Sequence, residues 1–293
     1  GEFYPARLPR ARESDDSPVR GPGERQISAV AHLNSHPRLV LLGDPGSGKS
    51  TFVNFVTLCL AGEALQHDQL NLTLLPSPLP DDLTAGAGQE EIPQPWVHDA
   101  LLPVRVVLRD FAARGLPAEG VATANHLWRF VVNELEAGAL GEYAPHLHKE
   151  LMTHGGLILL DGLDEVPDAE NQRGQIKHAI EDFATTFINC RMVVTSRTYV
   201  YQFQDWRLNG FTAAVLAPFT KGQITAFVDR WYAHIGELRH LQPDDAKGRA
   251  ELLKHAIFAN DRLRALTERP LLLTLTASLH AWRGGSLPDR REE

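Results

Sequence analysis

Two stretches of this sequence, far apart in the chain, carry residues that could do chemistry together. The first is RLVLLGDPGSGKST, residues 38–51, where an apolar run turns into a glycine-rich loop. The second is LILLDGLDEVP, residues 157–167, where another apolar run ends in Asp161 and is followed by Asp164 and Glu165. Like charges repel at this spacing, so the three acids need positive partners from elsewhere in the chain.

The glycine-rich stretch fits the phosphate-loop pattern G-x-x-x-x-G-K-[ST]. Its glycines let backbone N–H groups curl around an oxyanion, and the helix that follows adds the partial positive charge of its N-terminus. We expect Lys49 to reach the β and γ phosphates, Ser50 to offer its hydroxyl to Mg²⁺, and Thr51 to meet the α phosphate. The predicted nucleotide-binding residues are Gly43, Asp44, Pro45, Gly46, Ser47, Gly48, Lys49, Ser50 and Thr51.

The acids of the second stretch predict a metal ion and a positioned water. Asp161 would hold Mg²⁺ directly or through water, and a magnesium ion beside Lys49 would relieve the repulsion among the acids. Asp164 and Glu165 follow where an attacking water would sit, and one of them would orient or deprotonate it. We favour Glu165 slightly, although spacing alone does not choose between the two. The alternative is an acidic surface turn after a core strand.

A third stretch, CRMVVTSR at residues 190–197, reads as another buried strand with a polar end. A polar end beside the other two strands would face the γ phosphate, where Arg197 could sense or stabilise its charge. The alternative is an ordinary exposed arginine.

The order of elements predicts an α/β fold, a parallel sheet of about five strands flanked by helices, with the binding site at the carboxyl ends of the strands. A strand ending in Asp161 is typical of a neighbour of the phosphate-loop strand. One strand separates the two in sequence, however, which favours the ATPase branch, where another strand is inserted between them in the sheet. The expected strands are 38–43, 103–109, 156–161, 190–196 and 211–217, and the expected helices of this part are about 49–62, 123–137 and 170–188.

The pattern divides the chain into a flanking segment at 1–30, a nucleotide-binding domain at 31–218 and a helical subdomain at 219–293. Residues 63–98 within the second part are rich in Pro, Gly and acids, so we expect a mobile insertion. After Pro218 only helical patterns occur. Thr220 is expected to cap the first of these helices, and Pro270 to lie near the first turn of the last.

Composition restricts the classes of partner. The formal charge of the 293 residues is −8, which argues against a broad nucleic-acid surface. No apolar run approaches the roughly 18 residues of a membrane span. Cys59 and Cys190 lie in apolar contexts and are expected to be core thiols, which suggests a reducing cytoplasm. The start without Met and the charged end suggest a fragment of a longer protein.

Together these motifs resemble the NACHT family of the STAND class of signalling NTPases, over roughly residues 38–285. LLGDPGSGKST resembles the family's Walker A motif, LILLDGLDEVP its extended Walker B motif, and VVTSR its sensor 1. RPLLLTL is similar to the family's helical-domain motif, whose proline packs near adenine. The D-G-x-D-E arrangement is the most discriminating of these features.

The resemblance implies an ATP-dependent switch with slow hydrolysis. ADP would hold a closed monomer, and sensing of a ligand would allow exchange for ATP and self-association through the NACHT domain. Pro270 would contact the base. The family acts in antiviral defence in bacteria and in innate immunity in animals. The chain departs from the family pattern because the winged-helix domain, the sensor repeats and an effector domain are not evident in it.

Two other classes of protein also carry a phosphate loop. A P-loop GTPase normally carries N-K-x-D to read guanine, and none of the lysines in the sequence stands in such a motif; a small-molecule kinase should bring an arginine-rich lid and an acceptor site. A nucleic-acid motor or loader of the AAA+ kind fits poorly with the acidic balance, and salt-dependent DNA binding would revive it.

Overall fold

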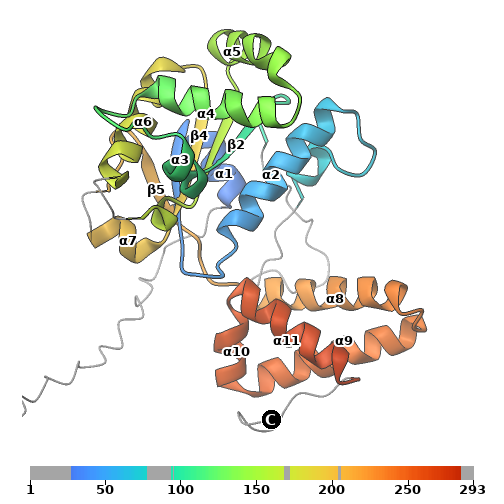
Figure 1. Cartoon of the computed structure of the whole chain (residues 1–293). Helices are drawn as coiled ribbons and strands as arrows, with labels where there is room; N and C mark the ends of the chain where they lie inside the picture. Colours follow the sequence, from blue (N-terminus) through green and yellow to red (C-terminus); the bar gives the residue numbers. More distant parts are fainter. Residues whose placement is uncertain (1–27, 78–93, 95, 168–171, 204–205, 285–293) are drawn as a thin grey trace, which may run out of the picture.

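The computed structural model describes residues 28–77, 94, 96–167, 172–203 and 206–284 (Figure 1). Most of the flanking segment predicted at 1–30 and the centre of the insertion predicted at 63–98 lie outside the described residues. The described beginning of that insertion contains a short 3₁₀ helix, η1 (Leu72–Leu74), and the backbone N–H of Leu72 donates to the Glu63 carboxylate at 3.0 Å. This part of the insertion is therefore tied to the helix that precedes it.

A five-stranded parallel sheet forms the centre of the molecule, in the order β2-β3-β4-β1-β5. All five expected strands are present, with ends that differ by up to two residues. Strand β4 lies between β1 and β3, so the inserted strand is confirmed, and the Asp161 strand is not a direct neighbour of the phosphate-loop strand. The strands are β1 (Arg38–Leu42), β2 (Pro103–Val107), β3 (Leu157–Asp161), β4 (Arg191–Ser196) and β5 (Thr212–Val215).

Apolar side chains cover both faces of the sheet because alternate residues of each strand point to opposite sides. Leu39 and Leu41 of β1 pack in one core cluster with α1 (Ala29–Ser35) and α2 (Lys49–Ala64), whereas Val40 and Leu42 belong to the other. The second cluster includes residues of α3 (Leu108–Arg114), α4 (Ala124–Ala137), α5 (Ala144–Thr153), α6 (Gln172–Thr186) and α7 (Thr198–Phe203). Because helices cover both faces, the ends of the strands are the part of the sheet that these helices leave uncovered.

The chain after β2 differs from the prediction. The strand expected to reach residue 109 ends at Val107, and α3 begins at Leu108. Leu108, Phe111 and Ala112 are buried, and their spacing is that of one helix face. Because a parallel strand buried on both faces also reads as an apolar run, the sequence pattern does not separate the first residues of α3 from the strand. Helices α1, α5 and α7 were not predicted either.

The last part of the described chain is entirely helical, as expected, and has a core of its own. Thr220 and Gln223 cap α8 reciprocally, since each side chain accepts a backbone N–H of the other residue. Pro270 is the first residue of α11, as its type favours. The elements are α8 (Lys221–Leu238), α9 (Pro243–Ala259), α10 (Asp261–Thr267) and α11 (Pro270–Trp282), packed around Ile224, Val228, Tyr232, Ala250, Leu253, Ile257, Leu273, Ala277 and Ala281.

Backbone hydrogen bonds fix the segment that connects the sheet to the helical part, and another one attaches the helical part to the loop after β1. The N–H of Leu216, just after β5, donates to Leu42 O at 2.8 Å, and the N–H of Phe219 donates to Glu268 O at 2.8 Å. At the other attachment, the N–H of Leu271 in α11 donates to Gly46 O at 3.2 Å. The start of α11 therefore lies on the loop that follows β1. Among the residues that the structure describes, no helix combines the length and apolar character needed to cross a membrane.

Candidate functional site

The loop after β1 has the conformation that its glycines permit. Gly46 and Gly48 have φ angles of 78° and 95°, in the left-handed region that side chains with a Cβ rarely adopt. Gly43 is confined differently, because a Cβ there would come within 2.4 Å of Ser47 Oγ. Gly48 then caps α2, and the first N–H groups of that helix have no acceptor inside it. The loop is therefore a cradle of backbone donors that a phosphate could fill.

Lys49 and Ser47 lie in this cradle, and each can make a further hydrogen bond to a ligand. The ammonium of Lys49 folds back onto two carbonyls of the loop, Gly43 O at 2.6 Å and Asp44 O at 3.2 Å. Ser47 Oγ is buried and has no hydrogen-bond partner. A buried hydroxyl without a partner is costly, and a phosphate oxygen would satisfy it.

Burial lowers the pKa of the Lys49 ammonium below its usual value, because desolvation penalises the charged form. The Arg197 guanidinium also acts to lower this pKa. The nearby acids Asp164, Asp44 and Asp161 act in the opposite direction without cancelling the effect of burial. An anionic ligand would restore the stability of the ammonium.

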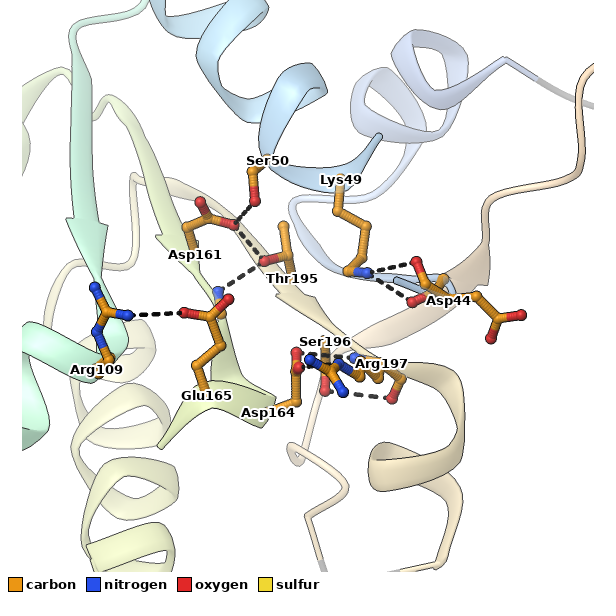
Figure 2. A network of polar contacts seen from close by, with 12 residues as sticks. Asp44, Lys49, Ser50, Arg109, Asp161, Asp164, Glu165, Thr195, Ser196 and Arg197 are labelled. Carbon is orange, nitrogen blue, oxygen red and sulfur yellow. Dashed lines mark hydrogen bonds and ion pairs between the residues drawn. The ribbon is translucent and has the colours of Figure 1, made fainter. Parts of the chain in front are cut away.

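Asp161 closes the other side of the cradle (Figure 2). Its Oδ1 atom accepts hydrogen bonds from the hydroxyls of Ser50 at 3.1 Å and Thr195 at 2.6 Å. Its Oδ2 atom pairs with Arg105 Nη2 of β2 at 3.1 Å. The carboxylate is buried, and both of its oxygens are engaged. The fold brings Ser50 and Asp161 together, as their predicted roles at one Mg²⁺ ion require. The contact with Arg105 was not predicted.

The carboxyl end of β4 links the two motifs directly. The N–H of Gly43 donates to Ser196 O at 3.2 Å, and the N–H of Gly162 donates to Thr195 Oγ1 at 2.8 Å. Thr195 in turn donates to Asp161. The inserted strand thus holds the phosphate loop on one side and the acidic turn on the other.

Asp164 and Arg197 form one unit. Asp164 Oδ1 accepts the backbone N–H of Arg197 at 3.0 Å, and Asp164 Oδ2 lies 2.8 Å from Arg197 Nε. The Asp164 side chain is 5% exposed, whereas that of Arg197 is 50% exposed. Both oxygens of Asp164 therefore contact Arg197 and hold its half-exposed side chain in place at the site.

Glu165 has a different environment from Asp164 although the two are adjacent. Its side chain is 47% exposed, and its Oε2 atom lies 3.9 Å from Arg109 Nη1 (Figure 2). Arg109 is the second residue of α3, and its Nε atom also lies 3.7 Å from Asp110 Oδ1. Because this contact is long and open to solvent, Glu165 keeps its oxygens available to water.

The helical part brings two residues to the phosphate loop. Pro270 lies beside Gly48, where a Cβ would be 3.8 Å from Pro270 Cγ. Arg269 Nη2 lies 3.6 Å from the Asp44 carboxylate. A Cβ on Gly46 would come within 2.9 Å of Leu271 Cβ. The start of α11 is therefore packed against the loop so closely that only glycine fits there.

Four acids of the site are paired with arginines; Arg105, Arg109 and Arg269 were missed from the sequence, as was the pairing of Arg197 with Asp164. The prediction assigned the relief of repulsion to Lys49 and a metal ion. In the structure Asp161 pairs with Arg105, Asp164 with Arg197, Glu165 with Arg109 and Asp44 with Arg269. A signal was present for Arg105, since a charged residue interrupts the apolar strand PVRVV.

The residues present fit a magnesium ion. Ser50 Oγ and Asp161 Oδ1 supply the hard oxygen donors that Mg²⁺ prefers, side by side at the end of the phosphate cradle. Of the other predicted residues, Pro45 and Thr51 are exposed, on the loop and in the first turn of α2. Cys59 and Cys190 are buried and free, as expected.

A parallel sheet with a glycine-rich loop between β1 and α2, and with acids at the end of a nearby strand, defines a P-loop NTPase. Comparison with protein families makes the assignment more specific, because a model described as NACHT domain matches residues 37–234. This match covers more than half of the chain, and the chain belongs to the NACHT family. It is therefore a nucleotide-binding NTPase of the STAND type. A comparison with curated proteins gave no match.

Proposed function

We propose that this chain is the nucleotide-controlled switch of a signalling protein, which binds ATP or ADP with Mg²⁺ and hydrolyses ATP slowly. The observation that carries the proposal is the contact between α11 and the phosphate loop, where Leu271 N–H donates to Gly46 O. Because this contact joins the loop to the helical part, filling the loop would shift the position of the helices.

The roles of the site residues follow from their positions. The loop N–H groups and Lys49 would bind the phosphates, and Ser50 and Asp161 would hold Mg²⁺. The ion, when bound, would neutralise charge on the phosphates. Arg197 would meet the γ phosphate, since Asp164 aims it at the mouth of the site. Pro270 would contact the base, as the resemblance to the NACHT family implies, and it lies beside Gly48 of the phosphate loop.

We assign the water-handling role to Glu165 rather than Asp164. Both oxygens of Asp164 are occupied by Arg197, whereas Glu165 is half exposed and its cation is 3.9 Å away. A general base needs a free lone pair within reach of water. Asp164 would then serve to hold Arg197 in place.

At the level of the molecule, we propose a nucleotide-binding domain at 31–218 and a helical subdomain at 219–293. Exchange of ADP for ATP would release the helical part and allow self-association, in response to a ligand sensed by a part of the protein outside this sequence. The family suggests a cytoplasmic role in antiviral defence or innate immunity.

One preparation tests the proposal. The purified protein is denatured, the released nucleotide is identified by chromatography, and ATP hydrolysis is assayed beside Lys49→Ala. Co-purified ADP, with turnover below about one per second that is lost in Lys49→Ala, is the expected result. An empty site with fast turnover, or released guanine nucleotide, would contradict the switch and favour a motor or a GTPase.

A further inference from the structure

Arg105 belongs to the site although it stands outside the nucleotide-binding motifs. It lies on the edge strand β2, opposite Leu159 of β3. Alternate residues of a strand share a face, so Arg105 is on the same face of the sheet as Leu159 and Asp161. Its guanidinium reaches along this face to Asp161 Oδ2 at 3.1 Å. A 35% exposed arginine thus covers a carboxylate whose side chain is 9% exposed.

The two oxygens of Asp161 serve different partners. Oδ1 faces the hydroxyls of Ser50 and Thr195, on the side of the phosphate loop. Oδ2 instead accepts a hydrogen bond from Arg105 of β2. The guanidinium can therefore stay in place while Oδ1 takes part in binding. Without it, a buried negative charge would stand beside the phosphates with no direct cationic partner, which is costly.

We propose that Arg105 is a built-in counter-cation for Asp161 that allows the site to bind a nucleoside diphosphate in the absence of a metal ion. This inference rests on the proposed site for nucleotide and Mg²⁺. Two effects act in the same direction when the charge of Arg105 is removed. Asp161 then repels a metal-free diphosphate more strongly, and it attracts Mg²⁺ more strongly, since both interactions follow the net charge at the carboxylate.

The test compares the affinity for a fluorescent N-methylanthraniloyl ADP in EDTA with that in excess Mg²⁺, measured by anisotropy. The measured quantity is the dissociation constant in EDTA divided by the dissociation constant in excess Mg²⁺. We expect Arg105→Met to raise this ratio about tenfold or more over the unmodified protein. A purely structural role would weaken binding in both conditions and leave the ratio unchanged, so the ratio separates the electrostatic role of Arg105 from a structural one.

Three further variants sharpen the test. Arg105→Gln keeps a hydrogen-bond donor without the charge and should raise the ratio as Met does, even if Arg105→Met folds poorly. Arg105→Lys keeps the charge and should hold the ratio near its original value. Arg114→Met is the matched control, because Arg114 pairs with Glu134 on the surface of α3 and α4, away from the site.

The outcomes are distinct. A ratio that is the same in Arg105→Met, Arg105→Gln and the unmodified protein would overturn the inference and leave the proposed function intact. Failure of the unmodified protein to bind the ADP probe in either condition would overturn both. A raised ratio in the two neutral variants alone would establish Arg105 as the counter-cation.

Discussion

Single residues of the site differ in how much freedom the fold leaves them. Lys49 is half-buried and turned back on its own loop, whereas Glu165 projects toward solvent. Asp161 and Asp164 are fixed by contacts to both of their oxygens. We therefore expect substitutions of the fixed acids to alter structure and binding, and substitutions of the freer residues to alter chemistry.

Nucleotide affinity should fall at alkaline pH earlier than the usual pKa of lysine would suggest. The pKa of Lys49 is lowered by burial, so the ammonium of the free protein loses its proton at a lower pH than an ordinary lysine. Phosphates favour the ammonium, so affinity should be constant below this pKa and fall up to tenfold per unit as the pH rises above it. Fluorescent ADP titrations from about pH 7 to about pH 10.5 measure this.

Lys49→Arg provides the comparison for that profile, because a guanidinium keeps its charge across the range. Its affinity can be lower throughout, but it should not show the alkaline decline. An identical decline in Lys49→Arg would assign the pH dependence to another group.

Glu165→Gln and Asp164→Asn should separate chemistry from structure. Glu165→Gln should lower the rate of hydrolysis by about 10²–10⁴-fold at unchanged ADP affinity, because it removes only a proton acceptor. Asp164→Asn should cost about 1 kcal/mol in the free energy of unfolding, after allowance for the half-exposed Arg197. Single-turnover hydrolysis and urea denaturation give the two quantities. Normal hydrolysis in Glu165→Gln would move the water-handling role to Asp164.

At the scale of elements, the contact between α11 and the phosphate loop makes Gly46 sensitive to the addition of a single methyl group. Gly46→Ala adds a Cβ at 2.9 Å from Leu271 Cβ, on a residue with a φ of 78°. We expect it to separate α11 from the loop and weaken ADP binding by more than about tenfold, with about 1–3 kcal/mol of destabilisation. Isothermal titration with ADP and thermal melting measure these effects.

Gly120→Ala is the matched control. Gly120 has a φ of 85°, yet a Cβ there would meet no atom within 4 Å. This variant carries the same kind of backbone strain without the clash, so it should be destabilised and still bind ADP normally. Equal ADP affinity in the two variants would show that contact with α11 is not needed for binding.

The sequence predicted the central elements well because their physics is local. The loop of Gly43–Lys49 follows a fixed pattern, and strands buried on both faces, such as β1 and β3, read as continuous apolar runs. The short helices α1, α5 and α7 have too few turns to show a clear period. The partner of Asp161 was missed because pairing of Arg105 with it depends on strand order, which brings together residues 56 positions apart.

At the scale of the whole molecule, the two cysteines report on opposite faces of the sheet. Cys59 packs in the cluster with α1 and α2, and Cys190 in the cluster with α3 to α7. Burial raises the pKa of both thiols, that of Cys190 to about 11. Their modification therefore requires opening of the structure.

ADP should slow the modification of both thiols. A ligand present at 100 times its dissociation constant stabilises the folded state by about 2.7 kcal/mol, so labelling that follows global opening should slow about 100-fold. Mass spectrometry after a timed reaction with a neutral thiol reagent measures each site. Lys49→Ala should show no such protection. An ADP-insensitive rate at Cys190 alone would mean that this face opens independently of the site.

The connection between the sheet and the helices limits the movement that a switch of this kind can make. Leu216 is hydrogen-bonded to Leu42 of β1 and Phe219 to Glu268, just after α10, so the linker between these two fixed points consists of Ala217 and Pro218. Proline fixes one of the backbone angles in this linker. If α11 leaves the phosphate loop, the helical part should rotate as a rigid body about this short and stiff hinge. The rotation should be restricted to one narrow range of directions.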